Sequence, residues 1–346
     1  MNNIITFAPP RSSRNENKRI HWLDVSRGLA FLMVIYSHLE FCDPVVMRYF
    51  KPVFLTTFFF VSGWLFKDKC KFSYVLEQRT RTLLLPMLAL GLIMILMEQV
   101  LTFGEKVPLI DSLKGLLFQN GENQILWFIA ALYVYSIFFY FVERLAWNSI
   151  LLLIFSLVLF IVNAIYSKCG GPALPWHIDG VGYACFYMGL GKFYRDNAEK
   201  CNRFIDNKWF VACCIIVYIS SIAIFDLDIS YSGSKYIIDA IVITLTGLVA
   251  MIYISKHILN NSRFLLFVGA NTLFYFAFHG KGYSLLTVIC HSVIPSRILD
   301  IALVNDIIAL AIVLLDAALL VVPAIIVNKY MPFLLGRGFK LWQVKS

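Results

Sequence analysis

Charged residues are scarce in this chain. Only 15% of its 346 residues are Asp, Glu, Lys or Arg, against roughly 25% in an ordinary soluble domain. Hydrophobic residues make up 60% of the chain, and its mean hydropathy is +0.75. A single soluble core cannot bury that much apolar surface. The composition therefore predicts an integral membrane protein that has membrane lipid as a partner.

Metal-ligand patterns are lacking as well. The eight cysteines form no CxxC pair and no His/Cys cluster with metal-site spacing, so we expect no metal. Whether Cys42 and Cys169 form a disulfide is left open by the sequence. The net charge of +9 comes from basic residues that lie between apolar stretches. Because these residues do not form a basic patch with interleaved aromatics, we expect no nucleic-acid partner.

Period-two alternation of apolar and polar residues is absent, which argues against transmembrane strands. The chain instead has ten apolar stretches of about the 20 residues that cross roughly 30 Å of hydrocarbon. Backbone amides in lipid must be hydrogen-bonded within their own segment, so we predict an all-α transmembrane bundle. The predicted spans are 22–40, 49–66, 83–103, 125–142, 149–166, 176–194, 209–225, 236–254, 264–289 and 303–327.

We predict a polar, basic N-terminal tail over residues 1–20 and one ten-helix membrane domain over 21–346. The first apolar stretch lacks a small-x-small cleavage site, so we expect a retained helix and not a signal peptide. The polar stretch 104–124 is predicted to be a loop. No internal repeat is evident.

Lysine and arginine are distributed unequally between the predicted loops. With the N-terminus inside, the cytoplasmic segments hold 21 of these residues and the opposite side holds eight. The positive-inside rule favours this orientation. The basic C-terminal segment returns to the same side only with an even number of spans. We therefore predict that both termini are cytoplasmic.

Arg27 and His38 lie in the first predicted span. Their separation of eleven residues corresponds to about 16 Å along an α-helix and returns to within about 20° of one face. Asp24 precedes Arg27 by three residues and can pair with it. In one interpretation, Arg27 snorkels to the headgroups and His38 is an interhelical hydrogen-bonding residue. In the other, Arg27 holds an anionic cytosolic ligand and a neutral His38 accepts a proton.

Basic residues follow the second predicted span. Ser62 and Gly63 near its end allow close helix packing or line a ligand channel. The cations after it suit either a solvated cytoplasmic loop or a phosphate site. They are Lys67, Lys69, Lys71, Arg79 and Arg81.

The ninth predicted span carries Asn271, Tyr275 and His279 at intervals of four residues, which places them on one polar stripe. Interhelical hydrogen bonding is the default role of such a stripe, and substrate binding is the alternative. We expect His279 at a depth similar to that of His38. An interruption of this span is predicted around residues 280–282, a Gly-Lys-Gly sequence.

Three further residues are candidates of lower weight. Trp127 begins the fourth span, where an interfacial role is the alternative to substrate binding. Asp179 can bind a polar acceptor or cap a helix. Asp316 is an intramembrane carboxylate without an assigned role.

Several of these residues together resemble the bacterial membrane-bound acyltransferases of family 3. The family characteristically carries an Arg, ten intervening residues and a His, and the pair Arg27 and His38 has that spacing. The run Phe59-Phe60-Val61-Ser62-Gly63 is similar to the family's phenylalanine-rich Ser-Gly segment. The weaker matches are Arg79 and Arg81 before Pro86, Trp127-Phe128, and the stretch Asn271, Tyr275 and His279.

The resemblance implies a ten-helix protein of the bacterial inner (plasma) membrane that transfers an acyl group, usually acetyl, from acyl-CoA to a sugar hydroxyl of a surface or lipid-linked glycan. Carried over, His38 is the catalytic base and Arg27 helps to hold the donor. Ser62, Arg79 and Arg81 line or attract the CoA end. The two arginines are two residues apart here and often three apart in the family. No soluble esterase-like domain follows, so we expect a stand-alone transferase.

A membrane transporter or flippase is the alternative function, because intramembrane His and Asp residues also line transport paths. That function predicts inverted-repeat symmetry, which is not evident, and no use of CoA. The acceptor sugar, the choice between direct transfer and an acyl-enzyme, and the oligomeric state stay open.

Overall fold

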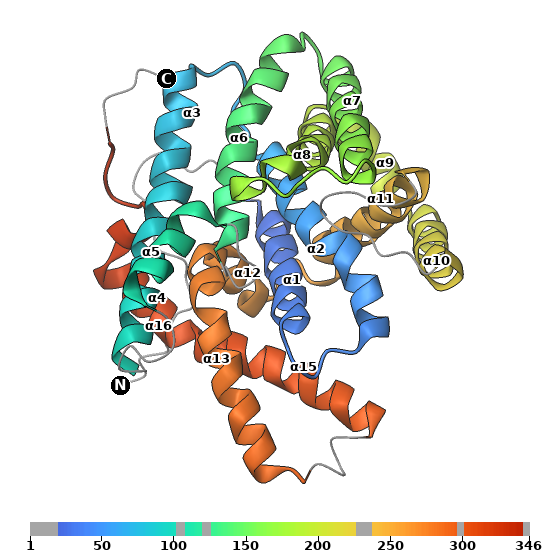
Figure 1. Cartoon of the computed structure of the whole chain (residues 1–346). Coiled ribbons are helices and arrows are strands. Elements are labelled where there is room, and N and C mark those ends of the chain that lie inside the picture. The colour runs from blue at the N-terminus through green and yellow to red at the C-terminus, as the bar shows by residue number, and fades with distance from the viewer. Residues whose placement is uncertain (1–19, 102–107, 120–125, 226–236, 296–300, 342–346) are drawn as a thin grey trace, which may run out of the picture.

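The described part of the chain is helical throughout. The computed structural model describes residues 20–101, 108–119, 126–225, 237–295 and 301–341, and no strand occurs in these ranges (Figure 1). The prediction of an all-α fold is confirmed. Of the predicted tail 1–20, only Ile20 lies within the described residues.

The helices are α1 (His21–Ser37), α2 (Pro44–Trp64), α3 (Phe72–Arg79), the π-helix η1 (Thr80–Leu84), α4 (Leu85–Leu101), α5 (Leu109–Phe118), α6 (Trp127–Leu145), α7 (Ser149–Lys168), the 3₁₀ helix η2 (Pro175–Gly180), α8 (Val181–Asp196), α9 (Ala198–Ile205), α10 (Lys208–Phe225), α11 (Ile237–Tyr253), the π-helix η3 (Ile254–Ile258), α12 (Arg263–Ala270), α13 (Thr272–Val293), α15 (Ala302–Leu319), α16 (Val321–Tyr330) and the 3₁₀ helix η4 (Pro332–Leu335).

Six helical segments in the described ranges are long and apolar enough to cross a membrane. They are Pro44–Trp64, Phe72–Val100, Trp127–Leu145, Ser149–Lys168, Ala240–Ile258 and Leu303–Tyr330, and the bent pair α9–α10 would make a seventh. The other predicted spans fall on α1, α8 and the pair α12–α13. Since α1 has 17 residues and α8 has 16, each is shorter than the usual 20-residue span. The number ten therefore stays a prediction.

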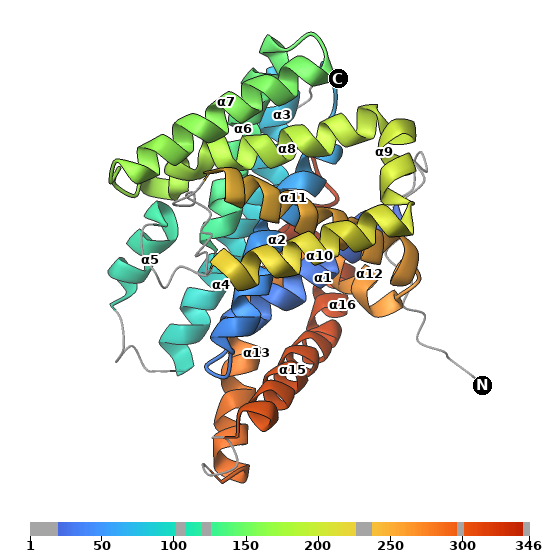
Figure 2. The same ribbon diagram turned by 90° about the vertical axis from the view of Figure 1, so that its right-hand side faces the viewer.

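α1 and α2 lie at the centre of the bundle, and glycines let other helices cross them closely (Figure 2). At the crossing of α1 and α12, a β-carbon at Gly28 or Gly269 would overlap the opposing backbone. At the crossing of α2 and α8, Gly63 faces the Met188 carbonyl and Gly191 faces the Phe60 carbonyl. Small residues permit such backbone contact between membrane helices, so these crossings fix the position of α1.

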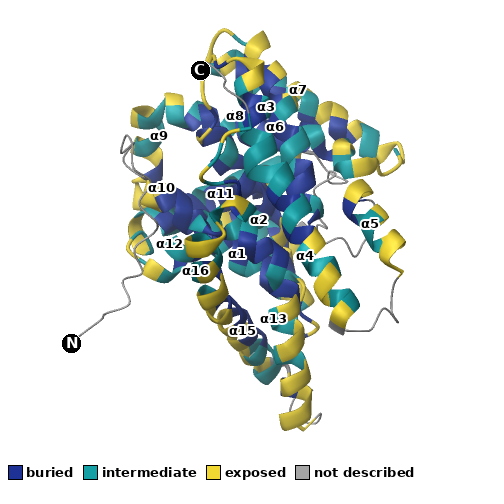
Figure 3. Ribbon diagram, turned by 90° about the vertical axis from the view of Figure 1, so that its left-hand side faces the viewer, coloured by how far each residue is buried: buried dark blue, intermediate teal, exposed yellow. Residues whose placement is uncertain are grey.

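α13 and α15 extend together away from the other helices, and exposed residues dominate their far ends (Figure 3). The predicted interruption of the ninth span at residues 280–282 is wrong. α13 is continuous there, and the break lies at Asn271, between α12 and α13. Gly282 instead gives room for the neighbouring helix, because a β-carbon at this position would overlap the Asp316 carboxylate.

Two other boundaries differ from the predictions. The described part of the predicted loop 104–124 contains α5, which begins after Pro108. The sixth predicted span, 176–194, begins with a turn in which Trp176 and His177 have φ values of 56° and 53°. The α-helix there starts only at Val181. Cys42 and Cys169 are free thiols, so the disulfide between them is not formed.

Candidate active site

Arg27 lies on the second turn of α1 and pairs with Asp24 on the same helix. Its guanidinium donates a hydrogen bond to the buried carboxylate of Asp24, as their spacing predicted. The Nε atom of Arg27 is buried and has no hydrogen-bond partner among the described residues. Since a buried polar atom is normally paired, this donor makes Arg27 a candidate for binding a ligand.

His38 is the C-terminal cap of α1, where its backbone amide donates to the carbonyl oxygens of Ile35 and Tyr36. Its exposed side chain packs against the ring of His279 on α13, with the ring centroids 5.3 Å apart. His279 itself is 1% exposed. The structure therefore confirms that these two histidines lie at a similar depth, with one open face on the His38 side.

The tautomer of neutral His279 follows from its backbone contact. Its Nδ1 lies 3.1 Å from the carbonyl oxygen of Tyr275. A carbonyl only accepts, so Nδ1 carries the hydrogen and Nε2 carries the lone pair. A neutral His279 can accept a hydrogen bond from an imidazole N–H but cannot donate one from Nε2.

Four phenylalanines from four helices pack beside the histidine pair. They are Phe31 of α1, Phe58 of α2, Phe128 of α6 and Phe276 of α13. Phe276 is 4.9 Å from Phe31, 5.5 Å from Phe58 and 5.2 Å from Phe128 by ring centroids. Phe31 also lies 5.5 Å from the His279 ring. This cluster gives the pair an apolar side where polar interactions are strong.

Ser62 is half-buried near the end of α2. The next residue, Gly63, is at the close crossing with α8, so the packing interpretation of this segment is supported. A ligand-binding role of Ser62 stays a prediction.

Arg79 and Arg81 have different surroundings. The Arg79 guanidinium lies 5.8 Å from the centre of the Phe66 ring, and its buried Nε has no hydrogen-bond partner within the described residues. Arg81 donates from Nε to Glu77 at 3.0 Å and from a terminal nitrogen to the Gly336 carbonyl at 2.5 Å. Because Arg81 already holds the C-terminal segment, Arg79 is the better candidate for binding an anion.

Asn271 and Tyr275 also make contacts within the protein. The Asn271 side chain donates to the Phe267 carbonyl and accepts from Asn328 at 2.7 Å. The Tyr275 hydroxyl donates to the Ala317 carbonyl at 2.9 Å. Both residues therefore hold helices together, and of the predicted stripe only His279 reaches His38.

Trp127 and Asp179 both lie near the turn at Trp176 and His177 that precedes α8. The Trp127 ring packs against His177 at 4.7 Å. Asp179 accepts a hydrogen bond from the backbone amide of Leu174 at 2.9 Å. Asp179 therefore stabilises the turn before α8, and it does not cap that helix.

The sequence interpretation missed a charged cavity near the end of α6. Lys192 lies near the end of the sixth predicted span, where the sequence counts it only among the basic residues of the cytoplasmic side. It is 7% exposed and pairs with Asp68, Asp196 and Glu143. A cavity of about 190 Å³ lies against these residues. The sequence interpretation also did not predict the surroundings of Asp316. This residue is fully buried, and its carboxylate has no hydrogen-bond partner in the described ranges. For Lys192 the sequence supplied only the residue types, since Asp68 and Glu143 come from other segments of the chain.

A comparison with known proteins identifies the family of this chain. The model of an acyltransferase domain family matches residues 20–327, which include all the site residues described above. No curated protein and no solved structure matches the chain. The matched range covers most of the sequence and contains several apolar helices of membrane-spanning length. The chain is therefore a multi-pass membrane protein that belongs to acyltransferase family 3.

Proposed function

We propose that this protein transfers a short acyl group, with acetyl as the expected group, from acyl-CoA to a sugar hydroxyl of a cell-surface or lipid-linked glycan. His38 is the general base. One observation carries the proposal: the exposed imidazole of His38 packs on the buried imidazole of His279, at the end of a helix that also holds Arg27. A base and an anion-binding group thus share one rigid element.

Arg27 and Arg79 bind the charged part of the donor. Each has a buried Nε atom without a partner among the described side chains and backbone, and guanidinium groups match phosphate oxygens well. Ser62 lies on the neighbouring helix as a further hydrogen-bonding group. Arg81 contributes mainly by holding the C-terminal segment through its hydrogen bond to the Gly336 carbonyl.

The chemical step is a direct transfer. Neutral His38 removes the proton from the acceptor hydroxyl as its oxygen attacks the thioester carbonyl carbon. The tetrahedral intermediate then collapses, the C–S bond breaks, and the imidazolium of His38 returns the proton to the CoA sulfur. The products are the ester and free CoA, and His38 is neutral again. General-base help of this kind is worth about 10²–10⁴ in rate.

His279 acts as a positioning residue for His38. Its hydrogen bond to Tyr275 leaves Nε2 as an acceptor, so His279 can fix the tautomer and orientation of His38. The four phenylalanines beside the pair keep water away from the thioester.

The protein works in the inner membrane of a bacterium, with both termini in the cytoplasm. The distribution of Lys and Arg supports this orientation, and it places the Arg27 end of α1 on the side where CoA is found. His38 then lies towards the outer side, where a glycan acceptor can approach.

The test is transfer of labelled acetyl from acetyl-CoA to the glycan fraction of membranes that contain the protein. We expect His38→Ala to lower the transfer rate at least about 100-fold, because the general base is lost. His21→Ala is the matched control, since His21 is exposed at the start of the same helix and should retain wild-type activity.

Expression of both variants is compared by their amounts in the membrane and their elution in size-exclusion chromatography. Full activity of His38→Ala at wild-type levels would show that the mechanism is wrong.

A further inference from the structure

α13 carries a polar stripe that continues beyond the histidine pair. We use the name α13 stripe for His279, Tyr283, Thr287 and His291, which follow one another at intervals of four residues. Side chains with this spacing lie on one slowly winding helix face. The α13 stripe is about 18 Å long at the rise of an α-helix. It begins at the buried His279 and ends at the exposed His291.

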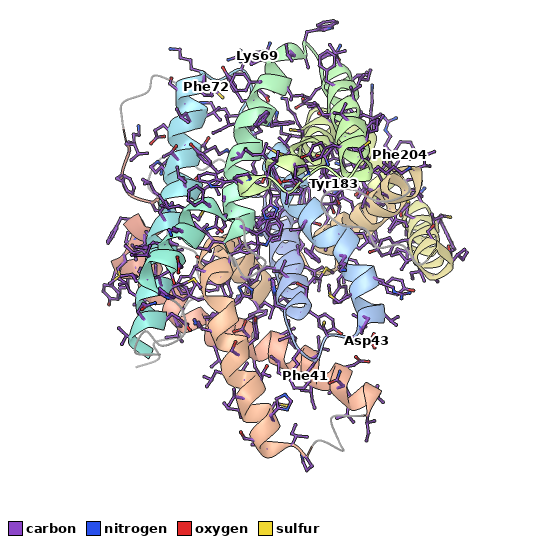
Figure 4. The ribbon with its side chains drawn as sticks, in the orientation of Figure 1. Phe41, Asp43, Lys69, Phe72, Tyr183 and Phe204 are labelled. Atoms are coloured by element: carbon purple, nitrogen blue, oxygen red, sulfur yellow. The ribbon has the colours of Figure 1, made fainter. Side chains whose placement is uncertain are left out.

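The loop that holds His38 reaches the other end of the α13 stripe as well. Glu40 lies on this loop, and its carboxylate is 3.4 Å from Nε2 of His291. The Phe41 ring packs on the His291 ring at 5.2 Å, and Asn305 of α15 donates to the Phe41 carbonyl at 3.0 Å. Figure 4 shows Phe41 where this loop approaches α13 and α15. The proposed base and the Glu40–His291 pair therefore share one short, fixed segment.

Two polar atoms, one on α13 and one on α15, have no hydrogen-bond partner among the described residues. They are the buried hydroxyl of Thr287 on α13 and one buried carboxylate oxygen of Asp306 on α15. Ser284 and Ser292, also on α13, both donate to the carbonyl four residues earlier, which Thr287 does not. Because buried polar atoms are normally paired, these two groups indicate a hydrogen-bonding ligand.

We propose that the α13 stripe, together with Glu40 and Asp306, binds the uncharged, polyhydroxylated part of the acceptor and guides one hydroxyl to His38. This inference rests on the proposed function and deepens it. Sugar hydroxyls both donate and accept, which matches carboxylate acceptors, an imidazole and a threonine hydroxyl. The two carboxylates disfavour a phosphate at this position, so the ligand is a neutral sugar ring.

The experiment uses the purified full-length protein in lipid nanodiscs, so that no sugar detergent competes. Labelled acetyl-CoA is the donor, and octyl β-D-glucopyranoside and 1-octanol are the acceptor probes. They share a tail, but only the glycoside carries a ring of hydroxyls. We expect kcat/KM for the glycoside to exceed that for octanol at least tenfold, because a site built for hydroxyls discriminates strongly against an analogue that lacks them.

Glu40→Gln and Thr287→Val should each reduce this preference at least fivefold through a higher KM for the glycoside. The KM for acetyl-CoA should stay within twofold. Ser292→Ala is the control, because its hydroxyl bonds to its own helix and both probes should behave as with the wild type.

A wild type without glycoside preference, or a preference that survives in both variants, would overturn this inference. Transfer of labelled acetyl to the membrane glycan fraction, lost in His38→Ala, would still uphold the proposed function. No transfer to either probe would overturn the inference, and only the loss of transfer to the glycan fraction as well would overturn the proposed function.

Discussion

Asp68 is the acceptor of two strong donors at the end of α2. Its carboxylate accepts hydrogen bonds from Lys192 and from Arg195, while Glu143 and Asp196 also pair with Lys192. Burial alone would raise the pKa of Asp68, but the hydrogen bonds and charges of the two cations outweigh it and lower that pKa. The ionised form of Asp68 therefore stabilises the folded protein.

The stability of the protein should depend on pH through this carboxylate. A lowered pKa in the folded state gives stability that is present above the ordinary aspartate pKa of about 3.9. That stability is lost as the pH falls towards the lowered value. Thermal unfolding of the purified protein should therefore show a Tm that decreases below about pH 4.

Asp68→Asn should lower the Tm at pH 7 and remove part of the decrease in acid. Asp111→Asn is the matched control, because the ion pair of Asp111 with Lys114 is exposed on α5 and such pairs contribute little. Equal acid profiles for the wild type and Asp68→Asn would contradict the assignment.

The sequence predicted some of the individual site residues and missed others for a physical reason. The pairing of Arg27 with Asp24 and the similar depth of His38 and His279 follow from helix geometry and from the length of a span. The different roles of Arg79 and Arg81 depend on Gly336, which is 255 residues from Arg81. The burial of Lys192 likewise depends on Asp68 and Glu143, two carboxylates from other segments of the chain, which no local pattern encodes.

At the scale of elements, close helix crossings set where α1 and α2 lie. Gly63 and Gly191 are reciprocal at the crossing of α2 and α8, because each faces a backbone carbonyl of the other helix. Backbone cannot move aside as a side chain can. These two positions should therefore tolerate no β-carbon without a shift of α2, the helix that carries Ser62.

Gly63→Ala and Gly191→Ala should each destabilise the protein by about 1–3 kcal/mol, the usual effect of overpacking. The measurement is the Tm in detergent together with the yield of monodisperse protein. Gly189→Ala is a matched control on the same helix, since a β-carbon there meets the Ser156 hydroxyl and not backbone. If all three variants unfold at the same temperature, the backbone contacts do not limit the packing.

Helix positions were more predictable than helix ends. All ten apolar stretches overlap helices, since apolar length alone marks them. The break before α13 lies at Asn271, whose side chain bonds to Asn328 on α16, and Gly282 serves contact with Asp316 on α15. The left-handed turn at Trp176 and His177 is held by Tyr135, which donates to the His177 carbonyl at 2.6 Å. These causes are tertiary contacts.

For the molecule as a whole, helix length and charge distribution together bear on how the chain crosses the membrane. Six segments of the described ranges are long and apolar enough to be membrane spans by themselves. The distribution of basic residues predicts that both termini lie inside, and this orientation requires an even number of spans. α1, α8 and α13 pack among other helices in the bundle. A helix that is surrounded by protein can cross the membrane with fewer apolar residues than a helix that faces lipid.

Fusion reporters should define the topology. Alkaline phosphatase, which needs an oxidising compartment for its disulfides, should be inactive when fused after residue 346 and active when fused after Lys168. A fusion after Arg144 serves as the internal control and should be inactive. An active C-terminal fusion would contradict the cytoplasmic assignment of both termini.

The contacts of the final described segment also bear on Arg81. Gly336 approaches the backbone of Arg81 in a left-handed conformation, and the Leu341 amide donates to Glu77 at 3.2 Å. Residues 336–341 thus tie the C-terminal part of the described chain to α3 and η1. Since Arg81 keeps its hydrogen bond to Glu77, a displacement of this segment would free only the terminal nitrogen that now donates to the Gly336 carbonyl, which adds one cationic donor two residues from Arg79.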